Sequence, residues 1–215
     1  MTFHKVISQK LAARLLKQGR LALACSVLLG GLAGCAAQPP THYYDLTPVV
    51  TPGQPLLKQS VTLGVGPVTM PDVLDRPGVV TRLQRTNVNV ANFHIWAGEL
   101  QPAFTRVLAA SVAGATQLDQ VWPSPWDNRF RPEYQVRVFV DRFSGELNGA
   151  VELNLSWTLL ADFGQEVILT RRYQAQRQSP GNYAGYVETL NLLVADFATE
   201  LSTQLPQHLP TSDTQ

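Results

Sequence analysis

The chain has 215 residues, of which 17 are Lys or Arg and 16 are Asp or Glu. The first 34 residues hold five of the basic side chains and no acidic one, so residues 35–215 hold 12 basic and 16 acidic residues, a net charge of −4. A net-negative body argues against nucleic acid as a ligand, because phosphate binding needs a basic surface. It also argues against adsorption to anionic lipid through a polybasic patch. Length and a 45% hydrophobic content predict one ordinary domain with a well-filled core.

The N-terminal segment, residues 1–34, has the organisation of a signal peptide. A basic stretch ending at Arg20 precedes an apolar run of about a dozen residues, too short for the ~20 residues that span a bilayer. The run ends in Leu32-Ala33-Gly34-Cys35, which resembles the lipobox of bacterial lipoproteins. We therefore expect cleavage between Gly34 and Cys35. Cys35 would then carry a covalent S-diacylglycerol and an N-acyl group, and no other cofactor is expected.

Two alternatives for Cys35 are a buried thiol and an ordinary secretory signal, but the order of basic, apolar and small segments favours lipidation. Cys25 lies in the apolar run and would be removed with it, which leaves the mature chain without a free thiol or a disulfide. Ala36 follows the lipidated cysteine. In the sorting pattern of enteric lipoproteins, a residue other than Asp at this position implies the outer membrane, facing the periplasm.

Hydrophobic periodicity and turn residues predict the elements of the body in chain order. Strands are expected at 41–46, at 61–66 (closed by Pro67), at 79–82 and at 87–92. An amphipathic helix is expected at 95–115, with Asn92 as a cap near its start, followed by a loop at 119–131. Strands at 134–143, 151–159 and 166–174 then precede a last amphipathic helix at 183–205.

This order predicts an α/β protein of the α+β type, with one mixed β-sheet and two main amphipathic helices packed on it. The expected organisation is a lipoprotein signal peptide (1–34), a lipidated cysteine with tether and first strand (35–55), a single α/β domain (56–206) and a flexible tail (207–215).

No catalytic or metal-binding motif stands out. Gly64-Val-Gly66 resembles the start of a dinucleotide fingerprint, but Pro67 follows, so the glycines are better explained by close packing on a buried strand. The histidines of the body, His42, His94 and His208, are far apart and lack metal-ligand spacing. For His94 we expect a polar cap or a place at the edge of the core.

Several other residues keep two interpretations. Asp75 and Arg76 suggest a local ion pair or a loop brace, and no third group beside Asp72 and Asp75 indicates acid–base chemistry. Tyr43 and Tyr44 are expected to pack as an edge strand. Trp122 and Trp126 fit a binding surface and a proline-rich loop packing about equally well.

Four stretches, in order along the chain, resemble the ABC-type transport auxiliary lipoproteins, the PqiC (YmbA) family. The first is the YYxL opening after the lipobox, and the second is a strand that leads into an L-D-R loop and a short strand closing on arginine. The third is a W-A-x-x-L helix start, where Gly98 departs from the larger residue we would expect, and the fourth is a late strand pair. In this chain they are Tyr43–Leu46, Gly64–Arg82, His94–Leu100 and Val136–Trp157.

The resemblance implies an α/β fold and a non-enzymatic role at the outer membrane. Its members work with an MCE-domain protein and, through it, with the permease and ATPase of an inner-membrane transporter, in moving lipid between the two membranes. Some members form rings, so a homo-oligomeric ring is among the expected assemblies.

The loop that carries the resemblance without carrying chemistry is the expected docking face, namely Leu74, Asp75, Arg76, Pro77 and Arg82. The alternative is that this loop only braces the sheet. A second functional hypothesis is a stand-alone lipid-binding or chaperone lipoprotein that holds an acyl chain between sheet and helix. An envelope hydrolase would need a nucleophile–base pair that the sequence does not display.

Overall fold

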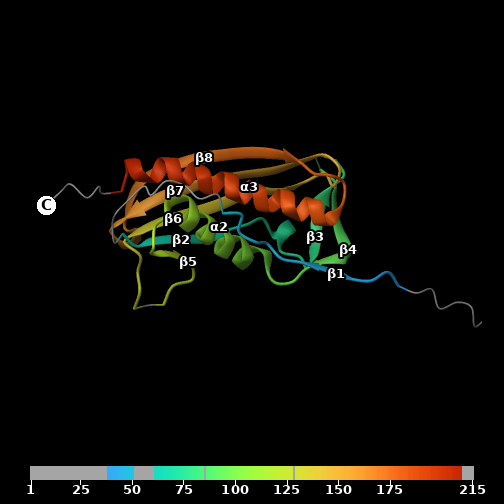
Figure 1. Ribbon diagram of the computed structural model, residues 1–215, viewed down its shortest axis with the longest axis horizontal. Coiled ribbons are helices and arrows are strands. Elements are labelled where there is room, and N and C mark those ends of the chain that lie inside the picture. The colour runs from blue at the N-terminus through green and yellow to red at the C-terminus, as the bar shows by residue number, and fades with distance from the viewer. Residues whose placement is uncertain (1–37, 51–60, 85, 128, 210–215) are drawn as a thin grey trace, which may run out of the picture. The chain divides into compact units, whose positions relative to one another are not determined.

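Eight strands and two long helices occupy the part of the chain that the computed structural model describes, residues 38–50, 61–84, 86–127 and 129–209. The strands are β1 (His42–Tyr44), β2 (Leu63–Thr69), β3 (Gly78–Arg82), β4 (Val88–Trp96), β5 (Val121–Pro123), β6 (Tyr134–Gly145), β7 (Ala150–Ala161) and β8 (Glu166–Gln178). The helices are α2 (Leu100–Thr116) and α3 (Tyr183–Gln204) (Figure 1). Cys35 and the signal segment lie outside the described residues.

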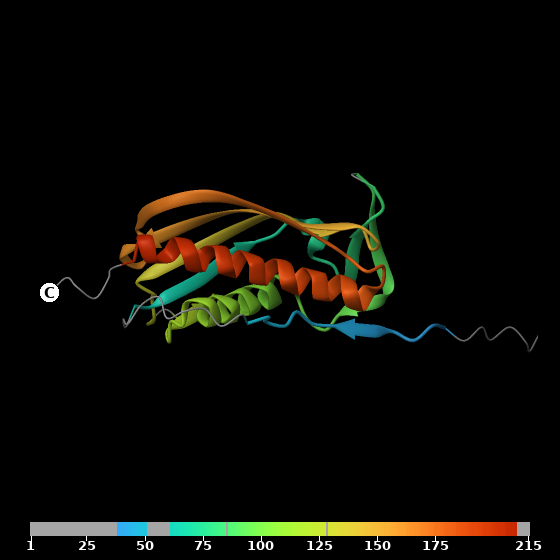
Figure 2. The ribbon, with the colours of Figure 1, turned by 45° about the horizontal axis from the view of Figure 1, so that its top comes forward.

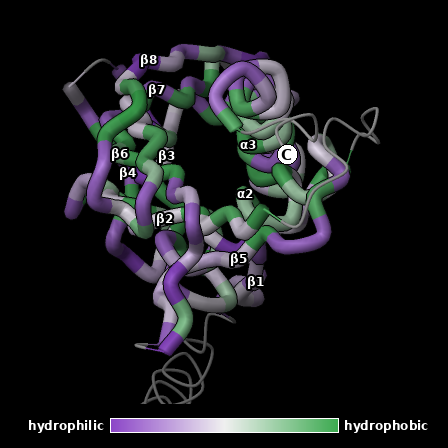
Figure 3. The backbone as a smooth tube through the Cα atoms, turned by 90° about the vertical axis from the view of Figure 1, so that its left-hand side faces the viewer, coloured by the Kyte–Doolittle hydropathy of each residue, from purple (hydrophilic) through white to green (hydrophobic). Residues whose placement is uncertain are grey.

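The larger sheet has the strand order β5-β2-β6-β7-β8. Strand β2 runs parallel to both of its neighbours, whereas β6, β7 and β8 form an antiparallel meander. Strict alternation in β7 sends the apolar side chains of Val151, Leu153, Leu155, Trp157 and Leu159 to one face, where all are buried. Both helices cover this face and lie side by side, as Figure 2 shows. In Figure 3 the strands curve partly around them.

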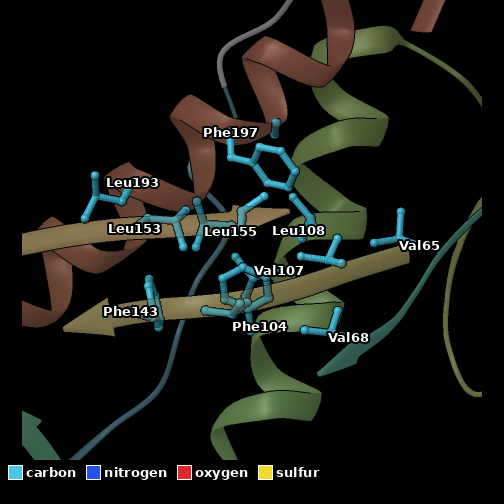
Figure 4. Packing of buried hydrophobic residues seen from close by; sticks show 14 of the residues in the cluster. Val65, Val68, Phe104, Val107, Leu108, Phe143, Leu153, Leu155, Leu193 and Phe197 are labelled. Atoms are coloured by element: carbon cyan, nitrogen blue, oxygen red, sulfur yellow. The ribbon is translucent and has the colours of Figure 1, made fainter. Parts of the chain in front are cut away.

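The core lies between this sheet and the two helices. Phe104 of α2, Phe143 of β6 and Phe197 of α3 are fully buried there, with leucines of β7 between them (Figure 4). The rings of Phe104 and Phe143 meet edge to face with centroids 5.2 Å apart. Helix α2 buries the stripe that its periodicity predicts, and α3 does the same.

The smaller sheet has the order β1-β4-β3. Strand β3 pairs antiparallel with β4, as predicted for this hairpin, and β1 adds in parallel at the edge. The edge position of Tyr43 and Tyr44 is therefore confirmed. The chain thus has the predicted α+β class with two packed helices, while its strands form two sheets where one was expected.

Several boundaries differ from the prediction, including the end of β8, which continues to Gln178. Ile95 and Trp96 extend β4 instead of opening the helix, because they pair with Tyr43 and Tyr44 of β1. Helix α2 therefore starts at Leu100, and its N-cap is Glu99, not Asn92. Strand β2 continues through Pro67 to Thr69, with a register shift between Val65 and Val68 that accommodates the proline. The predicted loop at 119–131 contains the short strand β5.

The C-terminal helix begins where expected. The side chain of Asn182 caps it by accepting a hydrogen bond of 2.8 Å from the Gly185 amide. A short 3-10 turn, Leu205–Gln207, follows the helix, and Leu209 is buried in the core. Residues 207–209 therefore pack against the body of the domain. The flexible tail expected from residue 207 stays a prediction, and residues 210–215 lie outside the described part.

Candidate docking surface

Some of the predicted docking residues are buried, and others are exposed to solvent. Residues Asp72–Leu74 form a single 3-10 turn after β2, closed by a 3.1 Å hydrogen bond from the Asp75 amide to the Asp72 carbonyl. Leu74 is buried in the core and anchors this turn. Asp75, Arg76 and Pro77 are exposed and form the tip, which we call the docking loop.

Strand β4 holds the C-terminal end of the docking loop in place. The Trp96 amide of β4 donates a 2.7 Å hydrogen bond to the Pro77 carbonyl, and Gly78 directly afterwards enters β3. A side chain on Gly78 would overlap the Ala91 carbonyl of β4, so this position requires glycine. The backbone at the end of the loop is therefore fixed against β4.

Arg82 does not share this surface. Its Nε donates a 2.9 Å hydrogen bond to Oγ of Ser144, which ties β3 of the small sheet to β6 of the large one. Arg82 thus braces the two sheets, in line with the second interpretation. Asp75, Arg76 and Pro77 at the tip are exposed and can contact a partner. Within the described residues no ion pair joins Asp75 to Arg76, so that interpretation was wrong.

An acidic hollow of about 230 Å³ lies beside the docking loop. Asp72 and Asp75 contribute carboxylates from one side, and Glu99 contributes one from the start of α2. No cluster of three or more His, Cys, Asp or Glu side chains in the described ranges is arranged to hold a metal ion. The carboxylates of Asp72, Asp75 and Glu99 therefore make this hollow negative.

A stack of aromatic side chains attaches β1 to the rest of the domain. The imidazoles of His42 and His94 stack with centroids 5.3 Å apart, and the ring of Tyr183 from α3 stacks on His94 at 3.8 Å. The Tyr44 hydroxyl lies 2.8 Å from Nδ1 of His94, within hydrogen-bond distance. His94 therefore sits in a strand at the edge of the core and does not cap the helix.

This stack predicts a pH dependence of stability. Burial, followed by the charge of His42, lowers the pKa of His94 below 6.5. Because the folded state disfavours the protonated ring, the contribution of His94 is fully present above pH 6.5 and is lost as the pH falls below it. Urea unfolding at pH 7.5, 6.5 and 5.5 should show a smaller decline for His94→Phe than for the wild type. Equal declines in the two proteins would contradict this expectation.

The tryptophans of the predicted loop divide between the two interpretations. A Cβ on Gly64 would overlap the Trp126 ring and Pro132, so this glycine does allow close packing on a buried strand, as expected. Trp126 thus serves loop packing. Trp122 is 48% exposed and meets Phe130 edge to face at 5.5 Å, which leaves part of its ring on the surface.

The contact partners of Arg82 and His94 could not be found from local sequence. Ser144 is 62 residues from Arg82, and His42 is 52 residues from His94. The pairing of β1 with β4 brings His42 to His94, whereas the packing of one sheet against the other brings Arg82 to Ser144. The departure at Gly98 has no structural cost, because it lies before the helix and its missing side chain would point into open space.

A family model of the ABC-type transport auxiliary lipoprotein component matches residues 44–202. The chain belongs to this family. The resemblance seen in the sequence is therefore confirmed, and membership makes the chain a membrane-anchored, periplasm-facing lipoprotein with an auxiliary role in transport.

Solved structures confirm the fold of this auxiliary lipoprotein. Protein XCC0632 from Xanthomonas campestris, of family DUF330, is 20% identical with a TM-score of 0.65, over 78% of this chain and 97% of that one. The crystal structure of an uncharacterized protein is 21% identical with a TM-score of 0.63, over 78% and 99% of the two chains. A comparison with curated proteins found no match. Among the described residues, no helix is both long and apolar enough to cross a membrane.

Proposed function

We propose that this auxiliary lipoprotein sits at the outer membrane and docks the periplasm-spanning MCE-domain protein of an ABC-type intermembrane lipid transport system. The observation that carries the proposal is the family match over residues 44–202. The lipobox at Leu32–Cys35 and the small Ala36 after it support anchoring at the outer membrane. The role is non-enzymatic, and the energy comes from the permease and ATPase that the MCE protein joins at the inner membrane.

The anchor would keep the domain close to the lipid. Six residues separate Cys35 from His42, and an extended chain over these seven residue steps reaches at most about 25 Å. Such a short tether suits a protein that docks the end of the MCE-domain protein close to the membrane surface. The exposed tip of the docking loop, with Arg76 as its cation, is the contact we assign to the partner.

The test is crosslinking in cells of the acylated protein, followed by purification and mass spectrometry of what it carries. An MCE-domain protein should be recovered with the wild type and lost with Cys35→Ala. Arg76→Ala should lose the partner with an unchanged melting temperature, because no hydrogen bond or ion pair of the described structure involves its side chain.

Arg82→Ala is the matched control for Arg76→Ala. It removes a hydrogen bond to Ser144 and should lower the free energy of unfolding by about 1 kcal/mol, while the partner is still captured by the folded fraction. Capture that survives Arg76→Ala would remove the docking loop from the interface. Loss of capture in both variants at equal cost in stability would favour a bracing role for the whole loop.

A stand-alone lipid carrier is the second candidate, because an apolar hollow of about 390 Å³ opens between β2, α2 and the segment after β5. It is lined by Pro67, Val68, Gln101, Pro102, Thr105, Ser124, Pro125 and Trp126. Lipid recovered with the protein in the absence of any protein partner would favour this function.

A further inference from the structure

The large sheet has a second face, opposite the helices, with an unusual composition at one end. Because side chains alternate along a strand, the neighbours of the buried valines and leucines point away from the core. In the register of the sheet, Arg137 of β6 lies beside Thr158 of β7 and Thr170 of β8. The next row is Phe139, Ser156 and Arg172. We call these six residues the outer sheet face.

The centre of the outer sheet face is aromatic. Phe139 is 53% exposed, although it stands in the middle of a strand and not in a turn. A shallow hollow of about 170 Å³ adjoins it, lined also by Thr69 of β2 and by Ser156 and Thr158. The Thr158 and Thr170 hydroxyls lie 3.0 Å apart and form a hydrogen bond with each other, so the surface beside Phe139 is polar. Exposed aromatic side chains in such settings are typical anchors of protein interfaces.

The charges of this face are also distinctive, since the body of the chain is net negative. Arg137 and Arg172 form no ion pair in the described part of the chain. Further along the sheet, Arg142 is neutralised by Glu152 at 3.2 Å, and Asp141 supplies one more carboxylate there. The two unpaired guanidinium groups therefore concentrate positive charge around Phe139.

We propose that the outer sheet face binds a carboxylate-bearing segment of a partner protein, with Arg137 and Arg172 pairing its acidic side chains and Phe139 contacting an apolar residue between them. The two arginines lie two strands and two residues apart, so their Cα atoms are about 12 Å from each other. Acidic residues at positions i and i+4 of an extended segment have about this spacing. Guanidinium groups suit such a partner because they bind carboxylates bidentately.

A protein partner fits this face better than a membrane surface. Adsorption to anionic lipid uses clusters of about four to eight basic residues. The outer sheet face has two, both arginines, and they alternate with hydroxyls around one aromatic ring. Arg and aromatic residues are enriched at protein interfaces. No residue of the outer sheet face belongs to the docking loop, so its test does not depend on the proposed function.

The experiment places the photo-crosslinking amino acid p-benzoylphenylalanine at Phe139 in the full chain, expressed in cells. The matched control is the same amino acid at Phe163, which is 50% exposed in the turn between β7 and β8. We expect a protein adduct from position 139 and none from position 163. The crosslinked peptide of the partner should carry two or more Asp or Glu residues.

Charge reversal then tests the arginines. Arg137→Glu combined with Arg172→Glu should reduce the adduct at least tenfold. Arg171→Glu should leave it unchanged, because Arg171 is the neighbour of Arg172 on the same strand but lies beside Trp157, on the helix side. Reversing the acidic residues of the crosslinked peptide to Arg should restore the adduct to the double variant. Melting curves establish that the variants fold, and Arg137→Gln with Arg172→Gln replaces the double variant if it does not.

Several outcomes would overturn the proposal. They are an adduct with lipid, an adduct with a second copy of this chain, a crosslinked peptide without acidic residues, equal adducts from positions 139 and 163, and an adduct that persists after charge reversal. Loss of the adduct with Arg171→Glu alone would also overturn it.

Discussion

Replacing Phe104 with alanine should lower the free energy of unfolding by about 3–5 kcal/mol. The ring is completely buried between α2 and the large sheet and meets Phe143 edge to face (Figure 4). Its removal loses both the transfer free energy of the ring and the contacts around the cavity left behind. Urea unfolding followed by circular dichroism measures the loss.

Phe139→Ala is the matched control for Phe104→Ala. It removes the same side chain from a surface position of the same sheet, and we expect a change of about 0.5 kcal/mol or less. A loss below about 1 kcal/mol for Phe104→Ala, or equal losses for the two variants, would contradict the packing described above.

Tyr186→Phe should cost about 2–4 kcal/mol, although it removes a single oxygen atom. The Tyr186 hydroxyl is fully buried; it donates a 3.0 Å hydrogen bond to the Val80 carbonyl of β3 and accepts one of 3.0 Å from the Gly145 amide of β6. Burial raises the pKa of Tyr186 to about 12, so the hydroxyl keeps its proton and can donate throughout the physiological range. Phenylalanine would leave a buried amide and a buried carbonyl without this partner.

Tyr173→Phe is the control for Tyr186→Phe. Tyr173 packs on Phe197 with ring centroids 4.9 Å apart, but its hydroxyl makes no hydrogen bond within the described residues. We expect a change within about 0.5 kcal/mol from thermal or urea unfolding. If the two substitutions lower the free energy of unfolding equally, the Tyr186 hydroxyl does not stabilise the contact between β3 and β6.

The elements that the sequence predicts best are those whose hydrophobic pattern fits either a strand or a helix, but not both. Strand β7 alternates without exception from Val151 to Leu159, and α3 has a helical stripe bounded by Pro180 at one end and Pro206 at the other. Ile95 and Trp96 fit both a strand and the first turn of a helix. Only the parallel partner β1, about fifty residues earlier in the chain, decides between the two, and local periodicity carries no information about such pairing.

For the candidate site, too, the sequence predicts local features but not contacts between distant residues. The position of the docking loop follows from its prolines and from the turn residues around it, and five residues, Leu74, Asp75, Arg76, Pro77 and Arg82, were predicted to share one docking face. Which of its members face inward was not predicted, because Arg82 finds its partner Ser144 on another sheet. The outer sheet face could have been found from the alternation of β6, which places Arg137 and Phe139 opposite the buried valines. It has no motif, so only the pairing of three strands brings its residues together.

The attachment of β1 decides how the protein responds to mechanical load. A pull on the N-terminal segment would enter the fold at the start of β1 and act along this strand and its parallel neighbour β4. Hydrogen bonds between such strands, with the Ala97 amide bonded to the Tyr44 carbonyl at 2.7 Å, are strained together in shear rather than opened one after another. We therefore expect this short edge strand to bear tension from the N-terminal segment in shear.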